Sequence, residues 1–326
     1  MLIPKIVGTG SYVPENIVTN LDVEKIVDTS EEWILSRTGI ITRHKCNDDQ
    51  TTSEISYCAS RQAMDMSGTE PEEIDLIIVG TASPDLPFPS TACLLQSKLG
   101  AKNAAAFDLT AACTGFIYGL SIGEQFIKSG RFKTILVVGA EILTKVTNYN
   151  DRTTCILFGD GAGAAIMKNH HDENGLFYTK ILSDGNLEHL IQIPAGGTRL
   201  PLTHELLDQN KNKIHMRGNE TFKYAVRLMH QIVVDALEAN DLEPEDIALF
   251  IPHQANIRII KALSSRLKFP LDKVWINIDK YGNTSAASVP IALDEAVRAG
   301  KVKEGDLIVM VAFGGGLTYG TAIYRW

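Results

Sequence analysis

TEPEEIDLIIVGT at 69–81 and LEPEDIALFIPHQ at 242–254 are two copies of one unit, offset by 173 residues. Each copy follows an amphipathic helical pattern, at 54–66 and at 222–240. Each also contains a short apolar segment that predicts a buried strand. The sequence therefore predicts two similar halves.

Downstream of each copy, the chain again has one order of elements: strand, turn, helix, glycine and strand. Gly130 and Gly300 stand where each helix ends, at a position that favours a left-handed backbone conformation. Aligning these glycines sets an offset of 170 and places Cys113 opposite Asn283. A pseudo-twofold axis would bring the two strand-to-helix turns together.

Strands that alternate with helices predict an α/β fold with mainly parallel sheets covered by helices. The segment between the repeats, at about 169–216, contains Gly196, Gly197, two prolines and polar runs, so it reads as an insertion rather than core. We therefore expect an N-terminal half at 1–168. A second half at 169–326 would contain the insertion and the C-terminal unit.

Composition restricts the class of protein. The 326 residues are 44% hydrophobic and 21% charged, as in ordinary globular proteins, and the net charge of −8 disfavours a general nucleic-acid binder. No apolar run approaches the roughly 18 residues of a membrane span, and the first ten residues lack a signal pattern. We therefore expect a cytoplasmic protein that does not bind membranes. The five cysteines lack disulfide or metal spacing, which indicates reduced thiols.

Cys113 lies in DLTAACTGF, directly after a predicted strand and at the first turn of a predicted helix. Unpaired backbone N–H groups and the positive end of the helix dipole would lower the pKa of a thiol there. Cys113 is therefore the candidate nucleophile. The alternative is a buried structural thiol, which we expect for the other cysteines: Cys46, Cys58, Cys93 and Cys155.

His253 and Asn283 are candidate partners of this thiol. His253 ends the strand of the second copy in FIPHQAN, and the carboxyl end of such a strand faces the ligand crevice of α/β proteins. Asn256 or Gln254 can begin the helix that follows. Taken alone, His253 would be a satisfied turn histidine, and Asn283, in KYGNTSAASVP, would be a helix cap. The alignment with Cys113 instead suggests that the Asn283 amide points at the reacting centre.

The glycine run AFGGGLTYG at 312–320 follows an apolar strand. It is too short, and wrongly placed, for a dinucleotide fingerprint or a P-loop. Two readings stay open. It is a tight hairpin before the last strand, or a bare loop whose N–H groups form part of an oxyanion hole, with Phe313 excluding water.

The predicted helix at 256–268 is amphipathic. Its apolar face consists of Ile257, Ile259, Ile260, Leu263 and Leu267, and its basic face of Arg258, Lys261, Arg266 and Lys268. No acidic residue occurs from position 249 to 271. A basic face is usually only solvated, but beside His253 it could guide an acidic protein or a phosphate-bearing substrate.

The motifs AACTGF, PHQAN, GNTSAASVP and FGGG, in this order and spacing, closely resemble the β-ketoacyl-acyl-carrier-protein synthase III family of bacterial type II fatty-acid synthesis. The resemblance covers essentially the whole chain, including GTGSYVPENIVTN, DTSEEWILSRTGI and FGDGAGAAI. It implies the thiolase fold and a homodimer without a cofactor. It also implies condensation of an acyl-CoA primer with malonyl-acyl carrier protein, which releases CoA and CO₂.

The resemblance also assigns chemical roles. It makes Cys113 the acyl acceptor, with the main-chain N–H groups of Cys113 and Gly315 holding the oxyanion. It makes His253 and Asn283 donors to the malonyl thioester carbonyl, while Phe313 shields the carboxylate. Two neutral donors suit a decarboxylative Claisen step, because a hydrolase would need a base to activate water.

Binding residues follow from the same resemblance. It places Trp33 and Arg152 on either side of the adenine of CoA, and Arg37 near a CoA phosphate. We also include Asn256 among the CoA contacts. Phe88 resembles the residue through which one subunit closes the acyl pocket of the other.

The surface expected to dock the acidic carrier protein, here called the basic patch, consists of Lys223, Arg258, Lys261 and Arg266. Its attraction would act at long range, chiefly on association. The sequence departs from the family pattern in a long 195–217 segment and in Arg217, both at the expected rim of the CoA tunnel.

Other functions stay open from sequence alone. The motifs do not separate fatty-acid initiation from a related condensing enzyme of a secondary-metabolite pathway. A Cys-His thioesterase would release CoA steadily without a malonyl donor. A non-catalytic carrier-binding scaffold is disfavoured, because all three reactive positions are intact. The length and branching of the starter chain, and any feedback control, are open as well.

Overall fold

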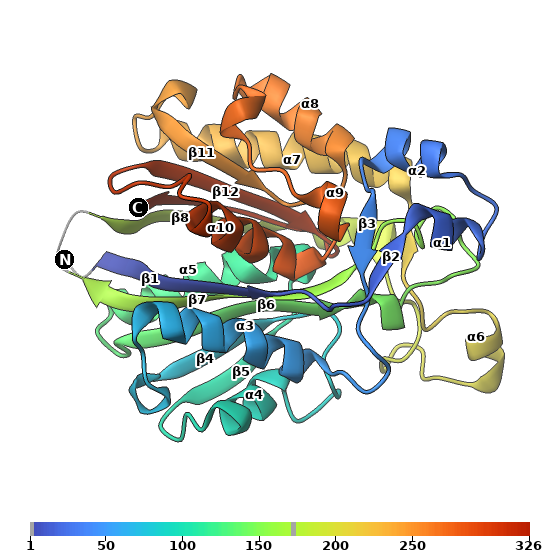
Figure 1. The fold of residues 1–326 in the computed structure, drawn as a ribbon, viewed down its shortest axis with the longest axis horizontal. Coiled ribbons are helices and arrows are strands. Elements are labelled where there is room, and N and C mark those ends of the chain that lie inside the picture. Colours follow the sequence, from blue (N-terminus) through green and yellow to red (C-terminus); the bar gives the residue numbers. More distant parts are fainter. Residues whose placement is uncertain (1–2, 171–173) are drawn as a thin grey trace.

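The computed structural model describes residues 3–170 and 174–326. Two β-sheets alternate with three layers of helices (Figure 1). The first sheet has the order β1 (Ile3–Tyr12), β7 (Asp160–His170), β6 (Thr134–Ile142), β4 (Leu76–Gly80) and β5 (Ala105–Leu109). The second has the order β8 (Gly175–Ser183), β13 (Thr318–Arg325), β12 (Leu307–Gly314) and β11 (Ile247–Pro252). In these orders, the second sheet repeats the first four positions of the first sheet.

The fifth position differs between the halves. Where the first half has β5, the second has only an isolated parallel bridge between Phe250 and Val274. The repeated order of strand, turn, helix, glycine and strand predicts a strand that begins at Trp275. This prediction is wrong, because no strand lies between β11 and β12 in the described chain. The backbone N–H of Asn277 donates to the Gln254 side chain, and the chain then turns into α9 (Ile278–Tyr281).

Both sheets are mixed. The pairs β6/β4, β4/β5 and β11/β12 are parallel, and the pairs β1/β7, β6/β7, β12/β13 and β13/β8 are antiparallel. The expectation of mainly parallel sheets is therefore wrong, although the α/β class is confirmed. The reason is visible between β12 and β13, where three residues join the strands, too few for a crossover.

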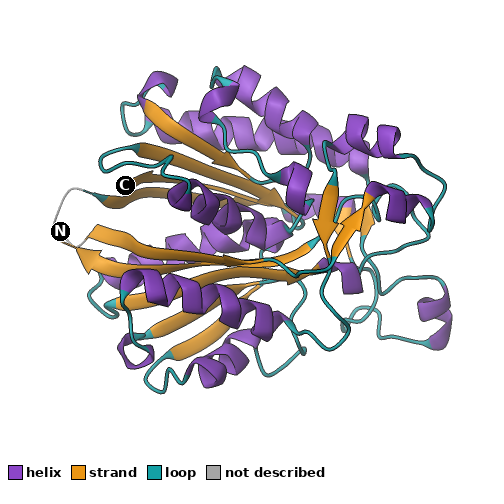
Figure 2. Cartoon of the chain, in the orientation of Figure 1, coloured by secondary structure: helices purple, strands orange, loops and turns teal. Residues whose placement is uncertain are grey.

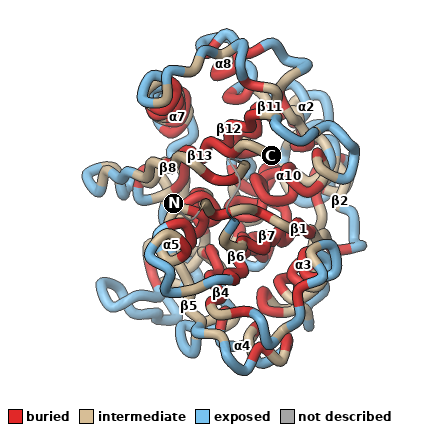
Figure 3. Tube along the Cα trace, turned by 90° about the vertical axis from the view of Figure 1, so that its left-hand side faces the viewer, coloured by how far each residue is buried: buried red, intermediate tan, exposed pale blue. Residues whose placement is uncertain are grey.

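Helices cover both sheets and separate them (Figure 2). The outer layers are α3 (Thr52–Ser67) with α4 (Thr91–Leu99), and α7 (Gly218–Glu238) with α8 (Ile257–Leu267). The central layer is α5 (Gly115–Lys128) and α10 (Ser288–Arg298), whose apolar side chains pack against strands of both sheets. Figure 3 shows that this layer and the strands beside it are largely buried. The predicted helices at 54–66, 222–240 and 256–268 are confirmed within a few residues.

Short elements gather at one end of the sheets (Figure 1). They are β2 (Ile17–Thr19), α1 (Asn20–Glu24), α2 (Glu31–Thr38), β3 (Thr42–His44), β9 (Ile191–Gln192), α6 (His204–Asp208) and β10 (His215–Met216). The predicted insertion was too long, because β8, inside it, pairs with β13 along the second sheet. The boundary between the halves at 168 stays a prediction.

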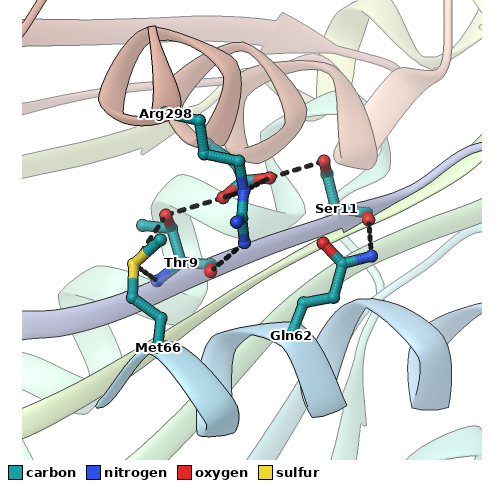
Figure 4. A network of polar contacts seen from close by, with 6 residues as sticks. Thr9, Ser11, Gln62, Met66 and Arg298 are labelled. Carbon is teal, nitrogen blue, oxygen red and sulfur yellow. Dashed lines mark hydrogen bonds and ion pairs between the residues drawn. The ribbon is translucent and has the colours of Figure 1, made fainter. Parts of the chain in front are cut away.

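A buried carboxylate joins the two halves (Figure 4). Asp294 of α10 accepts hydrogen bonds from Thr9 Oγ1 at 2.8 Å and from Ser11 Oγ at 2.6 Å, both in β1. It also accepts one from Arg298 Nε at 2.9 Å. Gln62 of α3 donates to the Ser11 carbonyl at 2.8 Å. Since charged groups are buried only when paired, this network fixes α10 against β1.

Candidate active site

The two repeated strand-to-helix turns meet at the centre of the molecule. Cys113 lies in the 3₁₀ turn Ala112–Thr114, directly before α5, and the equivalent turn Ser285–Ala287 directly precedes α10. The first residue of each turn has a left-handed backbone, with φ of 46° at Ala112 and 49° at Ser285. A non-glycine residue rarely adopts this conformation, so the two turns share one unusual geometry.

This geometry corrects the alignment made from the sequence. Ala112 and Ser285 are 173 residues apart, which makes Ala286, and not Asn283, the equivalent of Cys113. Aligning the glycines that end the two helices gave an offset of 170 rather than 173 residues, because α5 has 14 residues and α10 has only 11. The difference is about one helical turn. Asn283 lies two residues before its left-handed residue, whereas Cys113 follows its own.

Two glycines allow these turns to approach the strands. A Cβ atom at Gly314, the last residue of β12, would lie 2.6 Å from the backbone N of Cys113. A Cβ atom at Gly139 in β6 would lie 2.1 Å from the carbonyl O of Ala286. Only glycine fits at such distances. Each turn therefore packs against a strand of the opposite half.

Thr318 connects the turn of Cys113 to the glycine run. Its Oγ1 lies 2.9 Å from the Ala111 carbonyl and 3.3 Å from the Gly315 carbonyl, and it accepts from Thr114 Oγ1 at 2.7 Å. The N–H of Gly315 has no hydrogen-bond acceptor in the described part of the chain, whereas the N–H of Cys113 interacts with its own side-chain sulfur. The glycine run forms the hairpin between β12 and β13, and this hairpin lies against the turn of Cys113.

His253 follows β11 and is 2% exposed. Its backbone N–H donates to the Val311 carbonyl of β12 at 2.8 Å. Its Nδ1 lies 2.6 Å from Ser288 Oγ, at the first residue of α10. Burial lowers the pKa of His253 to about 3, so the imidazole is neutral at pH 7.

Asn283 is held by the backbone of two segments. Its main-chain N–H donates to the Leu157 carbonyl at 2.9 Å, and its carbonyl accepts from Gly159 N–H at 3.1 Å. Its side-chain Oδ1 accepts from Ser285 N–H at 2.9 Å. Because a backbone N–H can only donate, this contact fixes the amide orientation. The NH₂ group has no acceptor among residues 3–170 and 174–326, so it is free to donate to a ligand.

Sequence reasoning missed Glu141, a fully buried carboxyl group in β6. It accepts hydrogen bonds from Ser83 Oγ at 2.5 Å, Ala82 N–H at 3.1 Å and Ser285 Oγ at 2.9 Å. Burial raises the pKa of Glu141. The available signal was an acidic residue inside TILVVGAEI, a strand in which every residue is buried.

The pKa of Cys113 contradicts the sequence-based expectation. Cys113 is partly exposed, yet burial of its thiol raises its pKa to about 12. A hydrogen bond with the Ser285 side chain opposes this effect, and the negative charge of Glu141 adds to it. Desolvation is therefore the dominant effect on the thiol, and the resting thiol is protonated at pH 7.

The other cysteines are free thiols. Cys46 and Cys155 are buried and Cys58 is intermediate, but Cys93 is exposed on α4. The prediction of a buried thiol is therefore wrong for Cys93. Its Sγ lies 3.8 Å from the Ala106 carbonyl of β5, and β5 is the edge strand of the first sheet, where the side chain stays accessible to solvent.

Trp33 and Arg152, expected on either side of an adenine, contact each other. The guanidinium carbon of Arg152 lies 5.1 Å from the centroid of the Trp33 ring, a cation–π contact. Arg152 Nη1 also donates to the Asp28 carbonyl at 3.1 Å. An aromatic ring bound between the two side chains would have to separate them.

Asn256 connects α2 to α8. Its Oδ1 accepts from Arg258 N–H at 2.8 Å and caps α8, as the sequence suggested. Its Nδ2 donates to the carbonyl of Arg37 at 3.1 Å. Arg37 is exposed on α2. The candidate CoA residues therefore lie on one connected set of elements.

The basic patch is exposed. Its four side chains come from α7 and α8, and none pairs with an acidic residue of the described chain. The guanidinium of Arg258 lies 5.5 Å from the centroid of Phe222, beside Lys223 on α7. The apolar face of α8 packs into the core beneath.

Phe88 and Phe313 have opposite surroundings. Phe88 is 85% exposed, so this chain alone gives it no pocket, whereas Phe313 is buried in β12.

The segment at 195–217, which departs from the family pattern, lines part of a cavity of about 390 Å³ that does not reach the Cys113 turn. The cavity is lined by Asp151, His189, Gln192, Pro194, Lys211, His215, Met216 and Arg217.

None of the described helices is long and apolar enough to cross a bilayer. Across residues 3–170 and 174–326, no three His, Cys, Asp or Glu side chains are grouped as metal ligands.

Known proteins resemble this chain over its whole length. The family model 3-oxoacyl-[acyl-carrier-protein] synthase III matches residues 107–185, and its C-terminal model matches residues 237–326. The β-ketoacyl-[acyl-carrier-protein] synthase III of Caldanaerobacter subterraneus subsp. tengcongensis is 52% identical over 98% of this chain and 97% of its own. The crystal structure of 3-oxoacyl-[acyl-carrier-protein] synthase III from Aquifex aeolicus VF5 is 49% identical, with a TM-score of 0.93 over 99% of this chain and 100% of that chain.

A third relative, the priming β-ketosynthase of the R1128 polyketide pathway, is 35% identical, with a TM-score of 0.92 over 99% of this chain and 96% of that chain. Fold, site and relatives together define an acyltransferase-type condensing enzyme with the thiolase fold. The chain belongs to the 3-oxoacyl-[acyl-carrier-protein] synthase III family. The resemblance seen in the motifs is thereby confirmed.

Proposed function

We propose that the protein condenses a short acyl-CoA primer with malonyl-acyl carrier protein and so initiates type II fatty-acid synthesis. The products are 3-oxoacyl-acyl carrier protein, CoA and CO₂. The observation that supports the proposal is that one turn and the helix after it contact all three residues. Ser285, in the turn before α10, contacts the Cys113 thiol and the Asn283 amide oxygen, and Ser288, the first residue of α10, contacts the His253 ring.

In the first step, the sulfur of Cys113 attacks the carbonyl of the acyl-CoA. The tetrahedral oxyanion accepts hydrogen bonds from the N–H groups of Cys113 and Gly315. The N–H of Gly315 has no other acceptor within the described residues. The C–S bond to CoA then breaks, and the proton from the Cys113 thiol leaves with the CoA sulfur. The product is an acyl thioester on Cys113.

In the second step, the malonyl carboxylate leaves as CO₂ and its electron pair forms an enolate. The Asn283 amide and the ring N–H of His253 donate to the enolate oxygen. The enolate carbon attacks the acyl carbonyl, and Cys113 leaves as a thiolate that recovers a proton. A neutral histidine suits this role, because a donor is needed and no proton transfer to the imidazole is required. The buried Phe313 supports loss of the carboxylate by excluding water.

Incubation with malonyl-acyl carrier protein and a panel of acyl-CoAs, followed by mass analysis of the products, tests this function. We expect a 3-oxoacyl-acyl carrier protein two carbons longer than the primer. A preference for primers or acceptors outside fatty-acid synthesis would favour the second candidate, a priming synthase of the kind represented by the R1128 relative. Steady CoA release without a malonyl donor would indicate a thioesterase, which the low pKa of His253 disfavours.

We further propose that CoA binds at Trp33, Arg37, Arg152 and Asn256, and that the carrier protein docks on the basic patch. The connection of α2 to α8 through Asn256 supports the first assignment. The exposure of four unpaired cations on one face supports the second. The reaction uses two thioesters and needs no additional cofactor.

Reversing one charge of the basic patch tests carrier docking. The substitution Arg258→Glu should raise the KM for malonyl-acyl carrier protein about tenfold, since like charges at a docking surface oppose association. Added salt should shrink the difference between wild type and variant. The matched control is Lys301→Glu, the same charge reversal in an exposed turn after α10. Equal losses in acylation and condensation would instead mean that α8 only supports the pocket.

A homodimer completes the proposal. β5 is an edge strand with unpaired backbone groups, and the large apolar side chain of Phe88 is exposed to solvent. We propose that a second copy of the chain covers β5 and Phe88, and that Phe88 of each copy closes the acyl pocket of the other copy. A monomeric mass by light scattering would contradict this arrangement. We also place the protein in the cytoplasm, where five free thiols remain reduced.

A further inference from the structure

Ser288 is the only hydrogen-bond partner of the His253 ring within the described residues. It is the first residue of α10 and is 2% exposed. Its Oγ lies 2.6 Å from His253 Nδ1 and also accepts from the backbone N–H of Gln254 at 3.4 Å. Ser288 belongs to the motif GNTSAASVP, but none of the catalytic roles considered so far uses its hydroxyl.

Counting protons decides the direction of the bond between them. A neutral imidazole carries one ring proton, on Nδ1 or on Nε2. With the proton on Nδ1, Ser288 Oγ would receive two donors, and its own proton would have no acceptor among the described residues. An unpaired buried hydroxyl proton is unfavourable. With the Ser288 hydroxyl donating to Nδ1, every group is satisfied.

We infer that the Ser288 hydroxyl donates to Nδ1 of His253 and so fixes the imidazole as the Nε2–H tautomer. Ser288 is therefore a positioning residue that acts through His253. The role rests on the proposed function: Nε2–H can donate to the enolate oxygen, whereas a lone pair on Nε2 would repel it. The low pKa of His253 is consistent with a ring held neutral.

The repeat explains why a hydroxyl at the start of the central helix occurs in only one of the two halves. At the offset of 173, Ser288 corresponds to Gly115, the first residue of α5. A Cβ atom at Gly115 would lie 2.9 Å from the Cα of Gly80, so that position has no room for a side chain. Only the second half can place a hydroxyl at the start of its central helix.

NMR of the full-length protein labelled with ¹⁵N-histidine tests the tautomer directly. We expect the wild-type His253 spectrum to show a protonated Nε2 and an unprotonated Nδ1 that accepts a hydrogen bond, assigned by its loss in His253→Gln. A protonated Nδ1 in the wild type would overturn the inference. This readout does not depend on catalysis, so it stands even if acyl-CoA and malonyl-acyl carrier protein are not the substrates.

Kinetics test the positioning role. Ser288→Ala should slow CO₂ release about tenfold, the loss of roughly one hydrogen bond, while acylation of Cys113 changes little. Ser288→Thr, which keeps the hydroxyl, should restore most of the rate. The matched control is Ser264→Ala, which removes a buried hydroxyl bonded to the Phe269 carbonyl, away from the site. If Ser288→Ala lowers both half-reactions equally, or no more than Ser264→Ala does, the positioning role is wrong.

Discussion

Replacement of Cys113 by alanine is expected to abolish both the covalent acyl adduct and condensation. Among the five cysteines, only Cys113 combines a strand-to-helix turn, contact with the hairpin that begins at Gly314, and a position beside Ser285. Alanine has a hydrogen atom in place of the thiol and cannot form a thioester, so the entire covalent route is lost. Intact-mass analysis after incubation with acyl-CoA, followed by peptide mapping, measures the adduct.

The matched control is Cys93→Ala, because Cys93 is the exposed thiol and the one most accessible to non-specific acylation. That variant should acylate and condense like the wild type. An acyl group mapped to Cys93 or Cys155 in the wild-type protein would contradict the assignment. Residual condensation by Cys113→Ala would show that the acyl group need not pass through this residue.

Asn283→Ala is expected to slow malonyl decarboxylation by about 10²–10³, the usual effect of removing one pre-oriented donor to a developing oxyanion. Cys113 should still be acylated. The amide neither accepts a proton nor carries charge at neutral pH, so it has no second role in forming the thiolate. Single-turnover labelling with radioactive acyl-CoA follows the first step, and CO₂ release from malonyl-acyl carrier protein follows the second.

Asn283→Asp is the sharper companion. A carboxylate still accepts from the N–H of Ser285, so the turn keeps its bond, but it has no NH₂ group to donate. We expect its CO₂ release to be at least as slow as that of Asn283→Ala. Near-normal CO₂ release with collapsed labelling would reverse the roles and make Asn283 part of the acylation site.

Local patterns predicted much of the fold. The copies at 69–81 and 242–254 indicated two related halves, and the 3.6-residue periodicity located α3, α7 and α8. The sequence offered Asn256 or Gln254 as the start of α8, and Asn256 is the residue that caps it. These features depend on residues close together in the chain, which is why they can be read from it.

Long-range features were not predictable in the same way. The two halves were aligned with the wrong offset because a glycine that ends a helix does not reveal how long the helix is, and α5 is longer than α10. The pKa of Cys113 was predicted in the wrong direction because burial of the thiol depends on elements distant in the sequence. The contacts of Glu141 and Thr318 join segments 58 to 207 residues apart. The antiparallel strand pairs of both sheets likewise depend on the direction in which the chain re-enters the sheet, and the hydrophobic periodicity of a strand does not reveal that direction.

The matched left-handed residues Ala112 and Ser285 have a consequence for the history of the molecule. One backbone turn, present twice, lets selection alter the side chains of one copy while the other keeps its shape. One copy holds a reactive sulfur, and the other holds a hydroxyl in the same backbone context. The arrangement is what a duplicated and fused gene would leave behind, if its half-length ancestor paired with itself so that two identical turns faced each other. After fusion, each turn was free to specialise.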